Sequence, residues 1–253
     1  AVVPAALALE DAGGAAARVT FGDAACNAAP SAAGAAGGAG RAGAGASGGA
    51  AGPDLSHRDG TLFWRGEPLM PAAEIRLRGA HNRENAMAAA AVCLARGIEP
   101  AAVRDGLKTF AGVPHRLEEV ASINGVTYVN DSKATNVASA DVGIRSFDDG
   151  SVHLIAGGRG KGSDYGPLAA PVARHCKAVY LIGETAAALH VALAPTGVEI
   201  HECGDLEAAV GAAHEAAGAG DVVLLSPGCA SYDQYRSYEE RGDHFKTLVN
   251  ALE

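Results

Sequence analysis

The sequence has few aromatic residues, no surplus of positive charge and no pair of cysteines spaced as Cys-x-x-Cys. Its 20 Lys and Arg against 29 Asp and Glu give a net charge of -9, which argues against a general nucleic-acid-binding protein. The five cysteines are an odd number without metal-site spacing, so we expect reduced thiols and no metal ligands. One cationic pocket for an anionic substrate fits this balance, because net charge does not describe a single cleft.

Long apolar runs are also missing from the sequence. No continuous stretch reaches the ~20 apolar residues that a membrane-spanning helix needs. The first residues lack the basic segment that opens a signal peptide, so we expect a cytoplasmic protein without a membrane partner. The chain begins at Ala1 rather than at Met, which suggests that Ala1 is not the natural start. With 48% hydrophobic residues, the composition is that of a folded globular protein.

The first part of the chain, residues 1–112, has an uneven composition. Residues 31–52 contain only Ala, Gly, Ser and one Arg, which predicts a flexible low-complexity insertion. The remaining patterns predict a helix near Val3–Glu10, short strands including Ile75–Leu77, and two helices after Gly79. Residues 111–114 are a plausible linker to the second part.

The second part, residues 113–253, alternates short runs of Val, Ile and Leu with helical segments. This alternation predicts a doubly wound, Rossmann-like α/β domain with a mostly parallel sheet covered on both faces. The expected strands are Val126–Val129, Val152–Ala156, Ala178–Ile182, Val198–His201 and Val222–Leu225. Ligands bind at the carboxyl ends of the strands in such a fold, so the loops that follow them form the candidate site.

Four of these loops are unusually polar, and two of them carry residues suited to anions. Residues 130–136 place Asp131, Lys133 and two hydroxyls before a helix start, which suits an anion or a simply capped helix. Residues 157–164 present Arg159 and Lys161 on a glycine-rich turn that suits a carboxylate. A Walker A loop is excluded there, because Gly162 and not a hydroxyl residue follows Lys161.

Another of these loops, residues 226–234, contains Ser231 without the G-x-S-x-G pattern of a hydrolase nucleophile. Upstream, Asn82 and Asn85 lie three residues apart on one face of a predicted helix, where their amides can hold a nucleotide, or cap the helix and face solvent. Arg116, just after the linker, suits a phosphate or adenine contact or is a surface cation.

Taken in order, these segments resemble the Mur ligase family. The NDSKATN run at residues 130–136 is similar to the D-glutamate-adding members, because other members have a different sequence in this loop. The remaining similar segments are GAHNREN at 79–85, HRLE at 115–118, GGRGKGSDY at 157–165, LSPGCASYDQY at 225–235 and RGDHF at 241–245.

The resemblance implies an ATP- and Mg²⁺-dependent ligase that adds D-glutamate to UDP-N-acetylmuramoyl-L-alanine through an acyl phosphate, in peptidoglycan precursor synthesis. Residues 1–112 would be the end of an α/β ATP-binding central domain, and residues 113–253 the amino-acid-binding domain. By position, the resemblance implies nucleotide contacts at Asn82, Asn85, Arg116, Asp131 and Lys133. It implies D-glutamate and catalytic contacts at Thr135, Lys161 and Ser231, with Tyr232 and Tyr238 nearby.

The chain departs from the family pattern in one respect that bears on activity. It has no Gly-x-x-Gly-Lys-Ser/Thr phosphate loop, and the family's metal ligands are also missing, so we expect the chain to be inactive alone. We also expect it to be a monomer. Two other functions stay open at this point, a nucleotide-binding module and a non-catalytic scaffold derived from a ligase. The first is weakened because no predicted strand is followed by G-x-G-x-x-G.

Overall fold

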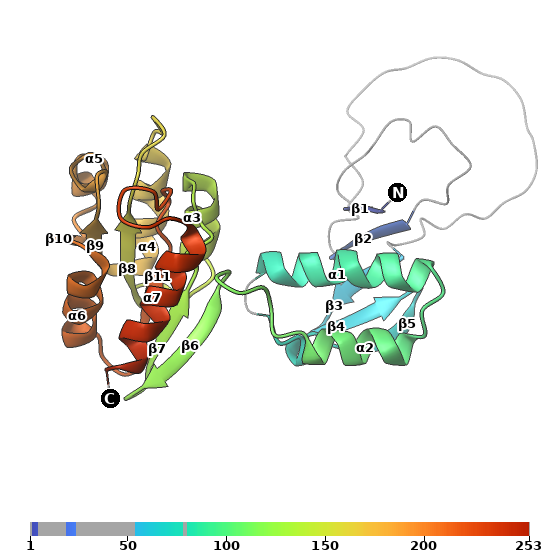
Figure 1. The fold of residues 1–253 in the computed structure, drawn as a ribbon. Helices are drawn as coiled ribbons and strands as arrows, with labels where there is room; N and C mark the ends of the chain where they lie inside the picture. The colour runs from blue at the N-terminus through green and yellow to red at the C-terminus, as the bar shows by residue number, and fades with distance from the viewer. Residues whose placement is uncertain (1, 5–18, 24–53, 78–79, 253) are drawn as a thin grey trace, which may run out of the picture. The chain divides into compact units, whose positions relative to one another are not determined.

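The computed structural model describes residues 2–4, 19–23, 54–77 and 80–252. The chain divides into two compact units, Ala1–Ala111 and Gly112–Glu253 (Figure 1). The predicted low-complexity insertion lies outside the described residues. So does most of the helix predicted at Val3–Glu10, although its first residues belong to a strand, Val2–Pro4, and that part of the prediction is wrong.

The first unit contains a five-stranded mixed sheet in the order β1-β2-β3-β4-β5. The strands are β1 (Val2–Pro4), β2 (Val19–Asp23), β3 (Leu55–Arg58), β4 (Thr61–Trp64) and β5 (Glu67–Pro71). The last three form two antiparallel hairpins, joined by the two-residue turns Asp59-Gly60 and Arg65-Gly66. All four turn residues have positive φ, as a twisted two-residue hairpin requires.

Two helices, α1 (Ala80–Ala95) and α2 (Pro100–Thr109), share an apolar core with β3, β4 and β5. Gly97 ends α1 with φ of 81°, and the amide of Ile98 donates to the Cys93 carbonyl at 3.1 Å. This is the left-handed cap that glycine forms most easily. The strand predicted at Ile75–Leu77 is wrong, because these residues follow a 3-10 turn and pair with no strand of the described chain.

The second unit contains a six-stranded sheet in the order β10-β9-β8-β11-β7-β6, parallel except for β6. Its strands are β6 (Glu118–Ile123), β7 (Val126–Asn130), β8 (Val152–Gly157), β9 (Cys176–Ile182), β10 (Glu199–Gly204) and β11 (Val222–Leu225). The predicted fold class is confirmed. The pattern did not reveal β6, a half-exposed edge strand joined to β7 by the turn Asn124-Gly125.

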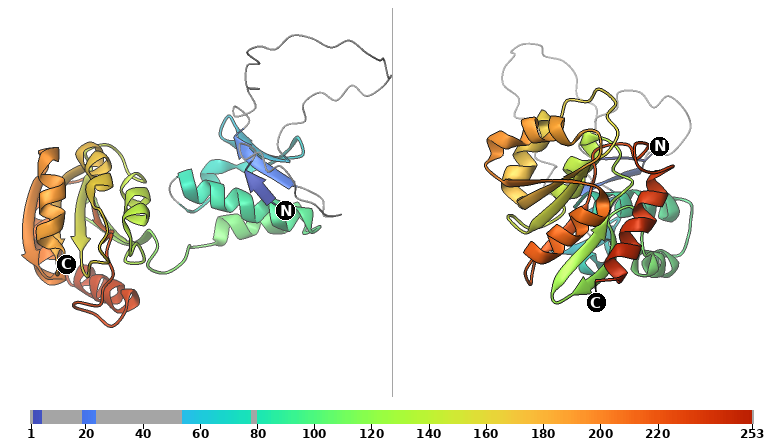
Figure 2. Two further views of the ribbon diagram at one scale, coloured as in Figure 1. Left: turned by 90° about the horizontal axis from the view of Figure 1, so that it is seen from above. Right: turned by 60° about the vertical axis from the view of Figure 1, so that its left-hand side comes forward.

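Helices cover both faces of this sheet (Figure 2). On one face α3 (Val137–Ile144), α4 (Ala169–His175) and α5 (Ala186–Leu193) share one apolar core. On the other face α6 (Leu206–Ala216) and α7 (Tyr238–Asn250) share a second core. No helix among the described residues has the length and apolar character that crossing a membrane requires.

The direction of the chain explains this division of helices. From β7 the chain moves to β8, β9 and β10 on one side, and it then returns to insert β11 between β8 and β7. Because crossovers between parallel strands are right-handed, reversing the direction moves the helix to the other face. Strand order therefore reverses around β11, and ligands bind outside the carboxyl ends of strands at such a reversal.

Candidate functional site

Three loops meet at the reversal point and are here called the carboxyl-edge loops: residues 130–136 after β7, 157–164 after β8 and 226–234 after β11. Backbone hydrogen bonds join them. The amide of Gly228 donates to the Ala134 carbonyl at 2.9 Å, and the amide of Arg159 donates to the Ala230 carbonyl at 2.8 Å. The loop after β11 thus lies between the other two and fixes their spacing.

Two glycines at the end of β8 permit this close approach. Gly157 and Gly158 have φ of 122° and 135°, a conformation that other residues rarely adopt. A Cβ at Gly158 would collide with the Ala230 carbonyl oxygen, and one at Gly157 would collide with that of Ile182. Gly158 is therefore required for the contact between the loops after β8 and β11, and Gly157 for the packing of the end of β8 against β9.

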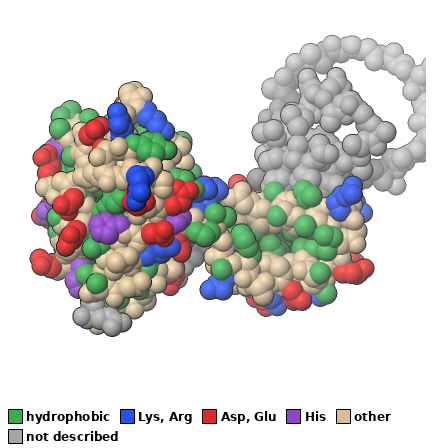
Figure 3. Space-filling model, in the orientation of Figure 1, with side chains coloured by type: hydrophobic (Ala, Val, Ile, Leu, Met, Phe, Trp, Pro, Cys, Tyr) green, Lys and Arg blue, Asp and Glu red, His purple; other side chains and the backbone are tan. Residues whose placement is uncertain are grey.

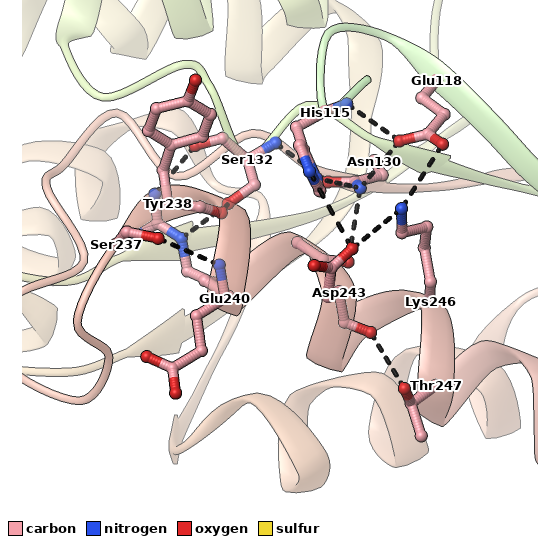
Figure 4. A network of polar contacts seen from close by, with 12 residues as sticks. His115, Glu118, Asn130, Ser132, Ser237, Tyr238, Glu240, Asp243, Lys246 and Thr247 are labelled. Atoms are coloured by element: carbon pink, nitrogen blue, oxygen red, sulfur yellow. Dashed lines mark hydrogen bonds and ion pairs between the residues drawn. The ribbon is translucent and has the colours of Figure 1, made fainter.

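A buried polar network anchors the loop after β7 (Figure 4). The Asn130 side chain is fully buried, and its amide nitrogen lies 3.0 Å from His115 Nδ1, 3.2 Å from Glu118 Oε2 and 3.3 Å from the Gly242 carbonyl. His115 in turn accepts the Lys133 amide through its carbonyl at 3.0 Å. A side chain at Gly242 would collide with the His115 ring. The first residues of the second unit are thereby fixed to the loop that contains Lys133.

Asp131, a predicted nucleotide contact, is only 5% exposed. Its carboxylate accepts the Leu117 amide at 3.2 Å and the Ser226 hydroxyl at 2.8 Å, so both oxygens have partners. Burial raises the pKa of Asp131 to about 6, against the opposing effect of those two hydrogen bonds and of nearby Arg116. In this arrangement the carboxylate links two of the carboxyl-edge loops, and its role toward a nucleotide stays a prediction.

Arg241 on α7 is a buried charged residue that the sequence analysis did not predict as part of the site. Its side chain is 1% exposed and donates hydrogen bonds to Ser132, Cys229 and Ala230. Arg241, Phe245 and Val249 are spaced i, i+4, i+8 and are all buried. A cation on an otherwise apolar helical stripe was the signal that could have identified it.

Two exposed cations stand in the loop after β8. Lys161 and Arg159 are exposed, and their side chains make no hydrogen bond or ion pair with any residue that the structure describes. Figure 3 shows Lys and Arg side chains at the end of the second unit where the loop after β8 lies. Such side chains are available to an anionic ligand.

The predicted hydroxyl and aromatic residues are distributed around these cations. Thr135 is half-buried, Ser231 is 3% exposed and Tyr232 is 62% exposed. Lys133 Nζ lies 3.3 Å from the Tyr238 hydroxyl and 5.3 Å from the centre of its ring. The structure therefore brings Thr135, Lys161 and Ser231 onto three adjoining loops, and it pairs Lys133 with Tyr238.

The remaining predicted contacts are in other positions. Arg116 is exposed in the second unit, just before β6. Asn82 and Asn85 lie in the first turns of α1 in the first unit, where Asn82 is 8% exposed and Asn85 borders an apolar cavity between α1 and α2. Their assignment to a nucleotide stays a prediction. Within the described ranges no three His, Cys, Asp or Glu side chains form a metal-binding group.

Comparison with known proteins finds similarity to one ligase family. The model of the family described as Mur ligase, glutamate ligase domain, matches residues 115–229. The UDP-N-acetylmuramoylalanine--D-glutamate ligases of Burkholderia mallei and Burkholderia pseudomallei are each 51% identical over 184 residues, covering 73% of this chain and 36% of the relative. The chain thus spans about a third of the length of these curated relatives.

Solved structures show the same fold at low sequence identity. The UDP-N-acetylmuramate-alanine ligase of Thermotoga maritima has a TM-score of 0.56 at 15% identity, covering 76% of this chain and 43% of that one. The Mycobacterium tuberculosis folylpolyglutamate synthase complexed with ADP has a TM-score of 0.55 at 19% identity, covering 77% and 48%. Residues 115–229 therefore match the glutamate ligase domain of the Mur ligases, and 73% of the chain is similar to D-glutamate ligases of that family.

Proposed function

We propose that this chain provides the amino-acid-binding part of an ATP-dependent ligase that joins D-glutamate to UDP-N-acetylmuramoyl-L-alanine in cytoplasmic peptidoglycan precursor synthesis. The observation that carries the proposal is the 51% identity to D-glutamate ligases over 184 residues. The geometry supports it, because a dicarboxylate needs cations and hydroxyls, and the carboxyl-edge loops offer both. Residues 1–112 are proposed to be the end of the central ATP-binding domain.

In this proposal the chain's own residues bind and orient the amino acid. Lys161 pairs with a carboxylate of D-glutamate, and Thr135 and Ser231 donate hydroxyl hydrogen bonds to its carboxylates. Tyr232 and Tyr238 border the bound ligand. Holding both carboxylates leaves the amine free to attack, so catalysis by these residues is chiefly positioning.

ATP, when bound, supplies the phosphoryl group that activates the carboxylate of the acceptor substrate. Asn82, Asn85, Arg116, Asp131 and Lys133 are the proposed nucleotide contacts. Among the described residues, no three His, Cys, Asp or Glu side chains form a group that could hold a metal ion by themselves. The 253 residues also contain no Gly-Lys-Ser/Thr phosphate loop. We therefore expect no turnover by this chain alone, and an ATP- and D-glutamate-dependent phosphate-release assay at the rate of a full-length ligase would contradict this.

The amino-acid site is tested by calorimetric titration of the 253-residue chain with D-glutamate, using L-glutamate and D-aspartate as controls. We expect binding of D-glutamate that is weak but stronger than that of either control. Titration to roughly 10 mM detects a Kd of about 1 mM, which corresponds to about 4 kcal/mol. Equal binding of the three compounds, or none, would contradict the assignment of this site.

The same calorimetry, extended to a titration with ATP, separates the rival functions. A nucleotide-binding module predicts binding of ATP with no response to D-glutamate. A non-catalytic scaffold predicts binding of neither ligand. Only the ligase proposal predicts stereoselective recognition of the amino acid.

A further inference from the structure

Arg241 connects two of the carboxyl-edge loops through one planar group. Its Nε donates to the Ser132 hydroxyl at 3.0 Å, and its Nη2 donates to the Ser132 carbonyl at 3.0 Å. The same Nη2 donates to the Cys229 carbonyl at 3.1 Å, and Nη1 donates to the Ala230 carbonyl at 3.3 Å. One guanidinium therefore contacts residue 132 in the loop after β7 and residues 229 and 230 in the loop after β11.

The acceptors of this buried cation are all neutral. Its four hydrogen bonds go to one hydroxyl and three carbonyl oxygens, and none goes to a carboxylate. Burial lowers the pKa of Arg241 to about 10, so the group stays charged at neutral pH. Cys229 and the Asp233 carboxylate raise the pKa of Arg241 by their charge, and the Asp233 carboxylate accepts the Glu184 amide at 3.1 Å. Burying a charge without a counter-ion is costly, so packing alone does not explain an arginine here.

The contacted residues immediately precede the proposed ligand contacts. Ser132 is followed by Lys133 and Thr135, and Ala230 is followed by Ser231 and Tyr232. A guanidinium is rigid and holds its donors in a fixed fork, so it sets the distance between the two acceptor segments. Lysine has the same charge but only one donor centre, so it does not reproduce these contacts.

We propose that Arg241 is a positioning residue for amino-acid binding, holding the Thr135 and Ser231 segments at one spacing while its charge lies beneath the bound anion. This proposal rests on the function proposed above. Recognition of the dicarboxylate then depends on the buried Arg241 as well as on the exposed residues that touch the ligand.

The test uses the 253-residue chain and its Arg241→Lys and Arg241→Gln variants. Arg174→Lys is the matched control, because Arg174 is an exposed arginine that pairs with Asp149 on the surface of the same unit. Hydrogen exchange followed by mass spectrometry reports on the backbone of residues 131–135 and 229–233. Calorimetry reports on D-glutamate affinity.

We expect both Arg241 variants to exchange faster in both loops, and to bind D-glutamate about tenfold or more weakly. Exchange in β9 should stay at the wild-type rate, since a general structural defect would raise it there too. The Arg174→Lys control should match wild type in both measurements. If the Arg241 variants do not fold, Ser132→Ala removes one acceptor and should give a smaller change in the same direction.

The two measurements test separate claims, the proposed function and the positioning role of Arg241. Wild-type chain that does not bind D-glutamate would contradict the proposed function, and the exchange measurement would still decide whether Arg241 holds the loops. Wild-type exchange rates in both loops of the Arg241 variants would overturn the positioning role. Faster exchange with unchanged D-glutamate affinity would overturn it as well.

Discussion

In the second unit, polar side chains at the amino and carboxyl ends of the parallel strands differ in whether they have hydrogen-bond partners. At the amino edge, His153 lies 3.0 Å from the Tyr180 hydroxyl and 3.3 Å from Asp221, which also accepts Lys177 Nζ at 2.6 Å. Every member of that network has a partner, as burial requires. At the carboxyl edge, Lys161 has no partner among the described residues. Polar groups that have partners within the protein stabilise the fold, whereas exposed groups without partners are available for a ligand.

Lys161→Ala provides the largest expected effect and tests the carboxyl edge. We expect D-glutamate binding to weaken by about 2 kcal/mol or more, which takes a Kd of about 1 mM out of the range of the titration, because a carboxylate would lose its strong cationic partner. The free energy of unfolding should change by about 0.5 kcal/mol or less, since the side chain is exposed. Calorimetry and urea unfolding measure the two quantities. Unchanged affinity would remove Lys161 from the proposed site.

Asp221→Ala tests the amino edge and should have the opposite pattern. The substitution leaves His153, Lys177 and the Gly218 amide without their shared acceptor. We expect the free energy of unfolding to fall by about 3 kcal/mol, with D-glutamate affinity unchanged. Asp221→Asn is the matched control, because it keeps one acceptor oxygen and should lose less. A reduced affinity with normal stability would contradict the division between the two edges.

Sequence periodicity predicted most of the second unit because buried parallel strands are short apolar runs. Val222–Leu225 was predicted with its observed bounds. The edge strand Glu118–Ile123 was missed, because it is half-exposed and its apolar residues do not form a run. The Asn124-Gly125 turn between it and the next strand was the local signal that indicated a hairpin.

The candidate site was only partly predictable for a related reason. Residues with distinctive loop chemistry, such as Lys161 and Ser231, stand directly after predicted strands, so a parallel sheet brings their loops together. Arg241 is 109 residues from Ser132 along the chain, and no local pattern reports a contact over that distance. The inward orientation of Asp131 likewise depends on Leu117 and Ser226, which come from separate segments.

Asp131→Asn is expected to stabilise the protein at neutral pH. Burial raises the pKa of Asp131 from 3.8 to about 6, so the folded state favours the protonated carboxyl. Its contribution is fully present below pH ~3.8 and is lost as the pH rises through about 6. The variant should therefore exceed wild type by about 2 kcal/mol at pH 7 and match it at pH 4. Urea unfolding at both pH values checks this, and equal differences at the two would contradict it.

His153 gives the smallest expected effect, with the opposite sign. Burial lowers the pKa of His153, against the opposing hydrogen bond and charge of Asp221, so the folded state favours the neutral ring. The contribution of His153 is present above pH ~6.5 and is lost as the pH falls through its lowered pKa, with a slope of at most about 1.4 kcal/mol per pH unit.

His153→Gln should remove this loss of unfolding free energy at acidic pH, while the pH dependence caused by Asp131 should remain. Unfolding free energies of wild type, His153→Gln and Asp131→Asn between pH 4 and 7.5 separate the two contributions. Wild type should show both dependences, and each variant should lack one. If His153→Gln kept the full loss of stability on acidification, the buried ring would not be its source. The amino edge would then contribute to stability through the Asp221–Lys177 pair alone.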